Sequence, residues 1–205
     1  MMFEAIPGRG REATNPVPPW PIEMLPDPDH PEGAALLRRL AEEHALDEWA
    51  SDRSPWEVAR AIEERCAEHF GMVDQTMFVS SNFGQFLFYR VTQAEQARRR
   101  VRVEAGWRET AVERDRWIRE RRPPADTPGL SLYICHGAPF AAVVPGIEGD
   151  LTELMRSIRE ELEVSGWQLL DQVLLAKRVP ADLEFESLLA TPPYRVFDVL
   201  FFAMD

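Results

Sequence analysis

The sequence predicts an α+β fold, with a mixed or antiparallel sheet of about five to six strands packed by helices. Two observations predict this fold, and a third bears on the domain organisation. Capped segments with apolar residues at helical spacing alternate with short runs rich in aromatic and β-branched residues. The third observation concerns the start of the chain, because eight of the seventeen prolines lie in the first 31 residues.

This proline-rich start is predicted to form an extended arm, because proline lacks a backbone N–H and favours the polyproline II conformation. We place the arm at residues 1–28 and a single α+β domain at residues 29–205, a length that suits one domain. Apolar residues near the end of the arm predict that this part packs on the domain surface: Trp20, Ile22, Met24 and Leu25.

Two capped helices open the domain. Asp29 and Glu32 have the spacing of a capping box around an early proline, and leucines give the following helix an apolar face. Ser54 and Glu57 form a second such box, with Pro55 at the first helical position. The apolar stripe of this second helix is predicted to end at Gly71 and comprises Trp56, Ala59, Ile62, Cys66 and Phe70.

Residues 76–92 change character, because aromatic and β-branched side chains surround the sequence Asn82-Phe83-Gly84. A short glycine-containing segment between two such runs predicts a hairpin with its turn at these residues. Thr92 and Glu95 then form a capping box for a long charged helix, which stops at the prolines that follow residue 122.

The last third of the chain repeats the alternation of strands and helices. Strands are predicted at 130–135 and 140–144, with a tight turn between them at 136–139. Asp150 and Glu153 are predicted to cap a helix that ends at Gly166, with an apolar face of Leu151, Leu154, Met155, Ile158 and Leu162. A buried strand at 167–176, a short helix at 181–190 and a final strand at 194–204 complete the prediction.

Composition excludes several classes of protein. The net charge of −12 disfavours binding to nucleic acid, which is itself a polyanion. No run of about eighteen apolar residues is present, so we expect no membrane partner. The start of the chain lacks the features of a signal peptide, and two cysteines, Cys66 and Cys135, do not make a disulfide framework. These features predict a reduced, cytoplasmic setting.

Charge is unevenly distributed along the chain. Residues 98–122 hold ten arginines against five acidic residues, and the acidic segments 32–70 and 148–186 carry ten carboxylates each. We expect the acidic segments to attract a basic protein partner. The predicted partner-binding residues are the carboxylates that follow the apolar stripe of the 150–166 helix and two arginines of the basic segment: Glu160, Glu161, Glu163, Arg100 and Arg102.

A strand ends at His136, Pro139 follows, and Asp150 precedes a helix that leads to a glycine and a strand bearing Leu-Leu-Asp. This order resembles the C-terminal half of the JAB (MPN) metalloprotease fold, particularly its RadC branch. The resemblance implies that His136 and Asp150 would bind zinc and that Pro139 is the motif proline. Ala138 stands where the second zinc histidine belongs, and a catalytic zinc needs three protein ligands. The implied protein is therefore a degenerate relative with an incomplete zinc site.

Other chemistry is weakly represented. Cys66 and His69 would share a helix face, but Cys135 and His136 would point to opposite sides of a strand, so the four do not predict one metal site. Neither a nucleophile elbow nor a phosphate-binding glycine loop is present. The sequence thus predicts no catalytic residue and no cofactor. It favours a non-catalytic cytoplasmic binding protein, of the immunity, inhibitor or accessory-subunit type, over the degenerate metalloprotease relative.

Overall fold

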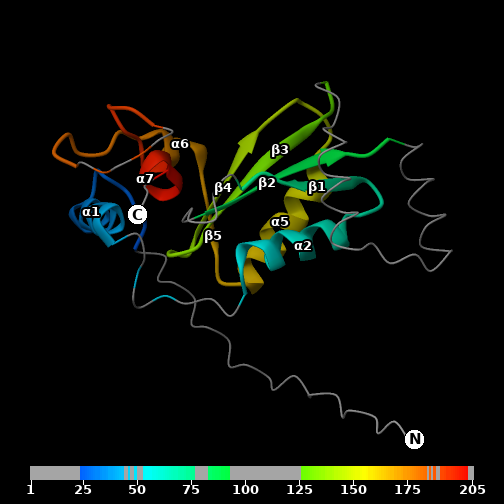
Figure 1. Cartoon of the computed structure of the whole chain (residues 1–205), viewed down its shortest axis with the longest axis horizontal. Helices are drawn as coiled ribbons and strands as arrows, with labels where there is room; N and C mark the ends of the chain where they lie inside the picture. Colours follow the sequence, from blue (N-terminus) through cyan, green and yellow to red (C-terminus); the bar gives the residue numbers. More distant parts are fainter. Residues whose placement is uncertain are drawn as a thin grey trace, which may run out of the picture.

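The computed structural model describes residues 24–43, 46, 49, 53–76, 83–92, 126–183, 185, 187 and 190–202. These residues form an open five-stranded mixed sheet packed by helices (Figure 1), which confirms the predicted α+β class. The predicted arm before Met24 and the charged helix after Thr92 lie outside the described residues. No helix among the residues that the structure describes is long and apolar enough to cross a bilayer.

The strands follow one another across the sheet in chain order. The first four pair antiparallel with their neighbours, and the last pairs parallel with the fourth. The strands are β1 (Phe70–Asp74), β2 (Phe83–Arg90), β3 (Gly129–Cys135), β4 (Phe140–Pro145) and β5 (Gln168–Leu170). Because β5 is short, the second half of β4 has no strand among the described residues on the side opposite β3, and a groove lies there.

The helices divide into two groups. Helices α2 (Pro55–Arg65) and α5 (Thr152–Val164) contact each other, and α2 also contacts β1 and β2. Helix α7 (Val196–Phe202) contacts β3, and α1 (Pro31–Glu43) and α6 (Gln172–Ala176) both contact α7. Figure 1 shows α2 and α5 together beside the strands, with α1, α6 and α7 gathered at the other end of the molecule.

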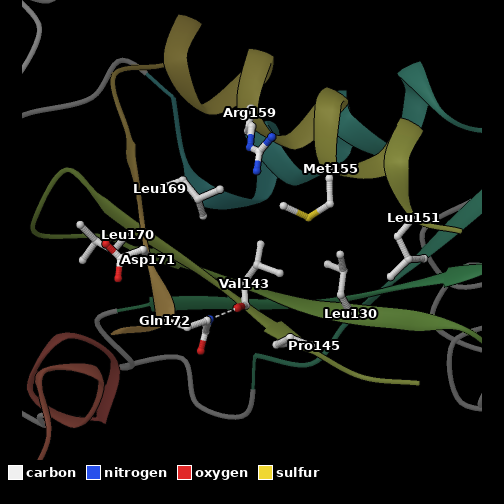
Figure 2. A pocket seen from close by; sticks show the side chains of 10 residues that line it. All are labelled: Leu130, Val143, Pro145, Leu151, Met155, Arg159, Leu169, Leu170, Asp171 and Gln172. Carbon is white, nitrogen blue, oxygen red and sulfur yellow. Dashed lines mark hydrogen bonds between the residues drawn. The ribbon is translucent and has the colours of Figure 1, made fainter. Parts of the chain in front are cut away.

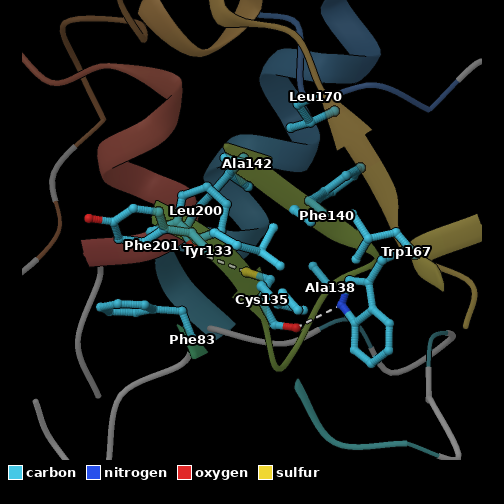
Figure 3. Close-up of a cluster of buried hydrophobic side chains, with 14 of the residues drawn as sticks. Phe83, Tyr133, Cys135, Ala138, Phe140, Ala142, Trp167, Leu170, Leu200 and Phe201 are labelled. Carbon is cyan, nitrogen blue, oxygen red and sulfur yellow. Dashed lines mark hydrogen bonds between the residues drawn. The ribbon is translucent and has the colours of Figure 1, made fainter. Parts of the chain in front are cut away.

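Strand alternation assigns core side chains to the two faces of the sheet. Gly84 shares a face with Phe86 and Phe88, and a Cβ atom at Gly84 would lie 3.0 Å from Pro55, so this face lies under α2. On the opposite face the Tyr133 ring lies 5.6 Å from the Phe201 ring of α7, and Figure 3 shows this second, aromatic-rich cluster.

Several predicted elements are confirmed. Ser54 accepts a hydrogen bond from the Glu57 backbone while the Glu57 carboxylate accepts from the Ser54 backbone, as a capping box requires. The hairpin of β3 and β4, with bends at residues 136–139, is as predicted. Gly166 follows α5 with φ of +82°, a conformation that glycine adopts without steric cost. Asp150, however, is not the N-cap of α5: Leu151 is, and no side chain caps it.

The predicted hairpin turn at Asn82-Phe83-Gly84 is wrong. Phe83 and Gly84 belong to β2, where they pair with Cys135 and Ile134 of β3. The hairpin partner of β2 is instead β1, whose first residues Phe70 and Gly71 had been assigned to the end of the second helix. That helix ends at Arg65, because the apolar residues after it alternate against a strand rather than a helix face.

The C-terminal predictions are also corrected. The buried strand predicted at 167–176 is only three residues long, because the Asp171 side chain accepts a hydrogen bond from the Leu174 N–H at 2.7 Å and starts α6. The final strand predicted at 194–204 is helix α7. At its start the Asp198 carboxylate accepts a hydrogen bond from the Arg195 N–H. The described residues of 181–190 form no helix.

The described residues before the predicted domain boundary are attached to the domain. Leu25 packs against the core, and the Lys177 ammonium lies 2.7 Å from carboxylate oxygens of both Asp27 and Asp29. A Cβ atom at Gly33 of α1 would lie 2.2 Å from the Asp27 carbonyl oxygen, so only glycine permits this close approach.

Two truncations test where the domain begins. A chain that starts at Met24 retains all of these contacts, so we expect it to unfold in urea at the same midpoint as the full chain. A chain that starts at Asp29 loses the Leu25 contact, which costs roughly 1 kcal/mol, together with the Asp27–Lys177 ion pair. Its midpoint should be lower, and equal midpoints for the two truncations would place the boundary at residue 28 after all.

Candidate functional site

Helices α2 and α5 lie antiparallel and form one layer. At one end His69, just after α2, lies 3.8 Å from Glu153 in the first turn of α5. At the other end Arg53, just before α2, donates a hydrogen bond to the Ser165 hydroxyl at the C-terminus of α5. The acidic segments 32–70 and 148–186, distant in sequence, therefore meet along these two helices.

Glu161 is the centre of an ion-pair network inside this layer. Its side chain is only 5% exposed, and it pairs with Arg53 and, at 3.1 Å, with Arg65. The prediction that Glu161 offers its carboxylate to a partner is therefore wrong: this carboxylate is buried and already bound. A buried carboxylate between two guanidinium groups joins the helices that carry them.

The burial of Glu161 follows from helix geometry. Glu161 lies three residues after Ile158 and seven after Leu154, and residues at these spacings share a helix face. Ser157 and Ser165, four residues to either side, are buried as well. The spacing from Leu154 and Ile158 is visible in the sequence. The sequence prediction placed Leu162 on the apolar face but assigned the neighbouring Glu161 to the surface.

Most of the other carboxylates of the layer face solvent. Glu160 is half-exposed and pairs with Arg65 at 3.1 Å, whereas Glu163 and Glu68 are exposed and have no ion-pair partner among the described residues. Arg60 pairs with Glu64 at 3.1 Å within α2. We define the acidic face as the outward carboxylates of this layer, which are Glu57, Glu64, Glu68, Glu153, Glu160 and Glu163. The predicted Arg100 and Arg102 lie outside the described residues.

The structure does not bring His136 and Asp150 together. His136 follows the end of β3, whereas Gly149 lies against Pro128, just before β3 begins. The two positions are separated by the seven residues of β3, roughly 20 Å at strand spacing. Hydrogen bonds from Thr152 lower the pKa of the Asp150 carboxyl. In the described part of the chain no three metal-binding side chains gather in one place.

Both cysteines are buried free thiols. Burial raises the pKa of Cys66 and of Cys135 to about 12, so neither is a thiolate at neutral pH. The Cys135 thiol donates to the Leu200 carbonyl of α7 at 2.9 Å, and the Cys66 thiol donates to the Ile62 carbonyl at 2.9 Å. Their roles are therefore in packing rather than in nucleophilic chemistry.

An apolar groove lies between α5 and the strands β4 and β5 (Figure 2). Its volume is about 610 Å³, within the usual range of small-molecule sites. No sequence pattern predicts this groove, because its lining comes from five separate elements, β3, β4, α5, β5 and α6, and because it depends on the shortness of β5. The lining residues are Leu130, Val143, Pro145, Leu151, Met155, Arg159, Leu169, Leu170, Asp171 and Gln172.

Comparisons of the chain with protein-family models, curated proteins and solved structures find no match. No relative therefore assigns a role to the acidic face or to the groove.

Proposed function

We propose that this chain is a non-catalytic binding protein that engages a basic macromolecular partner through the acidic face of α2 and α5. One observation carries the proposal: the three arginines in and beside α2, Arg53, Arg60 and Arg65, are bound to carboxylates of the same layer. Their charge is thereby neutralised locally, while Glu68 and Glu163 keep theirs without a described ion-pair partner. With the two exposed arginines of α5 included, residues 53–69 and 150–165 hold nine carboxylates against five arginines, so the layer carries a net negative charge.

A negative surface of this kind acts mainly on the encounter with a partner. It attracts a positive patch over the Debye length, about 10 Å at 0.1 M salt, and repels acidic competitors. Five of the six carboxylates of the acidic face stand on α2 and α5, which the Glu161 network holds together, and Glu68 lies in the turn directly after α2.

The proposal places the protein in the cytoplasm. Two free, buried thiols suit a reducing compartment, in which cysteines stay unpaired. An immunity protein, an inhibitor or an accessory subunit would work in this way, since each needs a shaped and charged surface but no reacting group. No observation on the described residues favours the degenerate metalloprotease, whose proposed ligands His136 and Asp150 stand apart.

Paired charge reversals test this proposal. The first variant carries Glu68→Lys and Glu163→Lys on the acidic face. The second carries Glu42→Lys and Glu148→Lys, two exposed positions outside that layer, and changes the net charge by the same amount. Affinity capture from an extract of the source cells, followed by stopped-flow measurements with the protein retained, compares both variants with the unmodified chain.

We expect only the first variant to lose the partner or to bind it more slowly. For the unmodified chain, the association rate should fall roughly tenfold or more as the salt concentration rises. Dissociation should change little. Equal behaviour of the two variants, or association indifferent to salt, would mean that the acidic face serves solubility alone.

A further inference from the structure

The apolar groove exists because β5 is short. Its three residues pair only with Phe140–Ala142, and the Asp171 cap then turns the chain into α6. The following half of β4, Val143–Pro145, therefore has no neighbouring strand on this side within the described chain. Helix α5 passes above that half of β4, and the uncovered strip between them is the groove (Figure 2).

The walls of the groove are mainly apolar and adaptable. Leu130, Val143 and Pro145 line it from the sheet, and Leu151 and Met155 line it from α5. The flexible thioether of methionine fits irregular apolar ligands well. An apolar body placed here would cover hydrocarbon that is now open to water, which is favourable in proportion to the area covered.

The polar groups of the groove differ in whether they are already bound. One Asp171 carboxylate oxygen accepts the Leu174 N–H as the cap of α6, and the Gln172 side-chain amide donates to the Val143 carbonyl. The Arg159 guanidinium has no hydrogen bond or ion pair with any residue that the structure describes. Figure 2 shows Arg159 projecting from α5 toward the groove, above Leu169. Arg159 is thus the one cation that lines the groove, and it has no partner among the described residues.

The backbone of β4 does not suit an added peptide strand. A peptide that pairs with a sheet edge needs free carbonyl and N–H groups along it. Here the Val143 carbonyl is occupied by Gln172, and Pro145 has no N–H to offer. A ligand that needs no backbone hydrogen bonds fits better.

We propose that the groove binds a small amphiphilic anion, with its acidic head at Arg159 and its apolar body along Met155, Val143 and Leu130. The chemistry required is one anionic group, for which a guanidinium is a strong hydrogen-bond partner, attached to an acyl chain or an aromatic body. None of the groove residues belongs to the acidic face. The test of the groove and the test of the acidic face can therefore give different results.

A pair of fluorescent probes with the same ring system tests the proposal. Anilinonaphthalene sulfonate carries an anion, and N-phenylnaphthylamine is neutral. Both should bind the full chain saturably. Arg159→Gln should weaken the sulfonate about tenfold and leave the neutral probe unchanged. The matched control Arg156→Gln removes an exposed arginine of the same helix that does not line the groove, and should change neither probe.

Two further arms locate and classify the ligand. Met155→Glu places a charge on the apolar wall and should weaken both probes. Decanoate should displace the sulfonate if the natural body is an acyl chain, and naphthoate if it is aromatic. Displacement by either supports the site. The proposal is overturned if neither displaces the probe, if Arg156→Gln weakens the sulfonate as much as Arg159→Gln, or if the sulfonate does not saturate.

Discussion

Glu161→Gln should destabilise the protein by about 2–3 kcal/mol, although the substitution removes only a charge and keeps the shape of the side chain. The Glu161 carboxylate is 5% exposed and is bound by Arg53 and Arg65, one before α2 and one at its end. Without it, the two guanidinium groups face each other across a buried neutral amide. Because both arginines are partly exposed, water compensates them in part, which keeps the cost below that of a fully buried pair.

Glu160→Gln is the matched control for this prediction. Glu160 also pairs with Arg65 at 3.1 Å, but its side chain is 52% exposed. An exposed pair of this kind contributes roughly 0–1 kcal/mol. Urea unfolding followed by circular dichroism gives both free energies. Equal losses for the two variants would show that the buried network is no more important to α2–α5 packing than a surface ion pair.

Sequence predicted the elements whose boundaries are set by local chemistry. The capping box of Ser54 and Glu57 and the left-handed Gly166 place the start of α2 and the end of α5, because their hydrogen bonds and backbone conformation need only neighbouring residues. The α+β class followed from such elements. The fold class alone does not predict that β1 pairs with β2, or on which face of α5 Glu161 lies.

The elements that sequence missed depend on tertiary contacts. The segment that forms α7 is rich in aromatic and β-branched residues, which favour a strand, yet Val196, Val199 and Leu200 share the inner face of a helix. Packing on β3 outweighs the intrinsic preference. Between α2 and β1 the sequence has no turn signal, and the first glycine is Gly71. The apolar stripe of the helix was therefore predicted to extend to Gly71, into β1.

The groove could not be predicted for a related reason. It depends on the length of β5, which is fixed where the Asp171 side chain caps α6, and on α5 lying above the unpaired end of β4. Each apolar lining residue is ordinary in its own segment of the sequence. Only their assembly, together with the uncommitted Arg159, distinguishes the site.

Trp167→Ala should cost about 3–5 kcal/mol, because it removes the largest side chain between α5 and β5. Trp167 is 3% exposed, and its indole Nε1 donates to the Cys135 carbonyl at 2.9 Å, across from the end of β3. Its ring also lies 5.2 Å from that of Trp49 in an edge-to-face arrangement. One side chain thus holds three segments of the chain together, and Figure 3 shows its hydrogen bond to Cys135.

Trp167→Phe separates the two contributions of this residue. Phenylalanine keeps most of the apolar contact but leaves the buried Cys135 carbonyl without its donor, so we expect a loss of about 1–3 kcal/mol, smaller than that of alanine. Trp56→Ala, at a 39% exposed position on α2, provides the control and should cost about 1 kcal/mol or less. Thermal and urea unfolding give the stability of each variant. We would follow them by far-UV circular dichroism, because replacing a tryptophan changes the intrinsic fluorescence. If Trp167→Ala were no more destabilising than Trp56→Ala, the junction of α5, β5 and the β3–β4 turn would not be a closely packed part of the core.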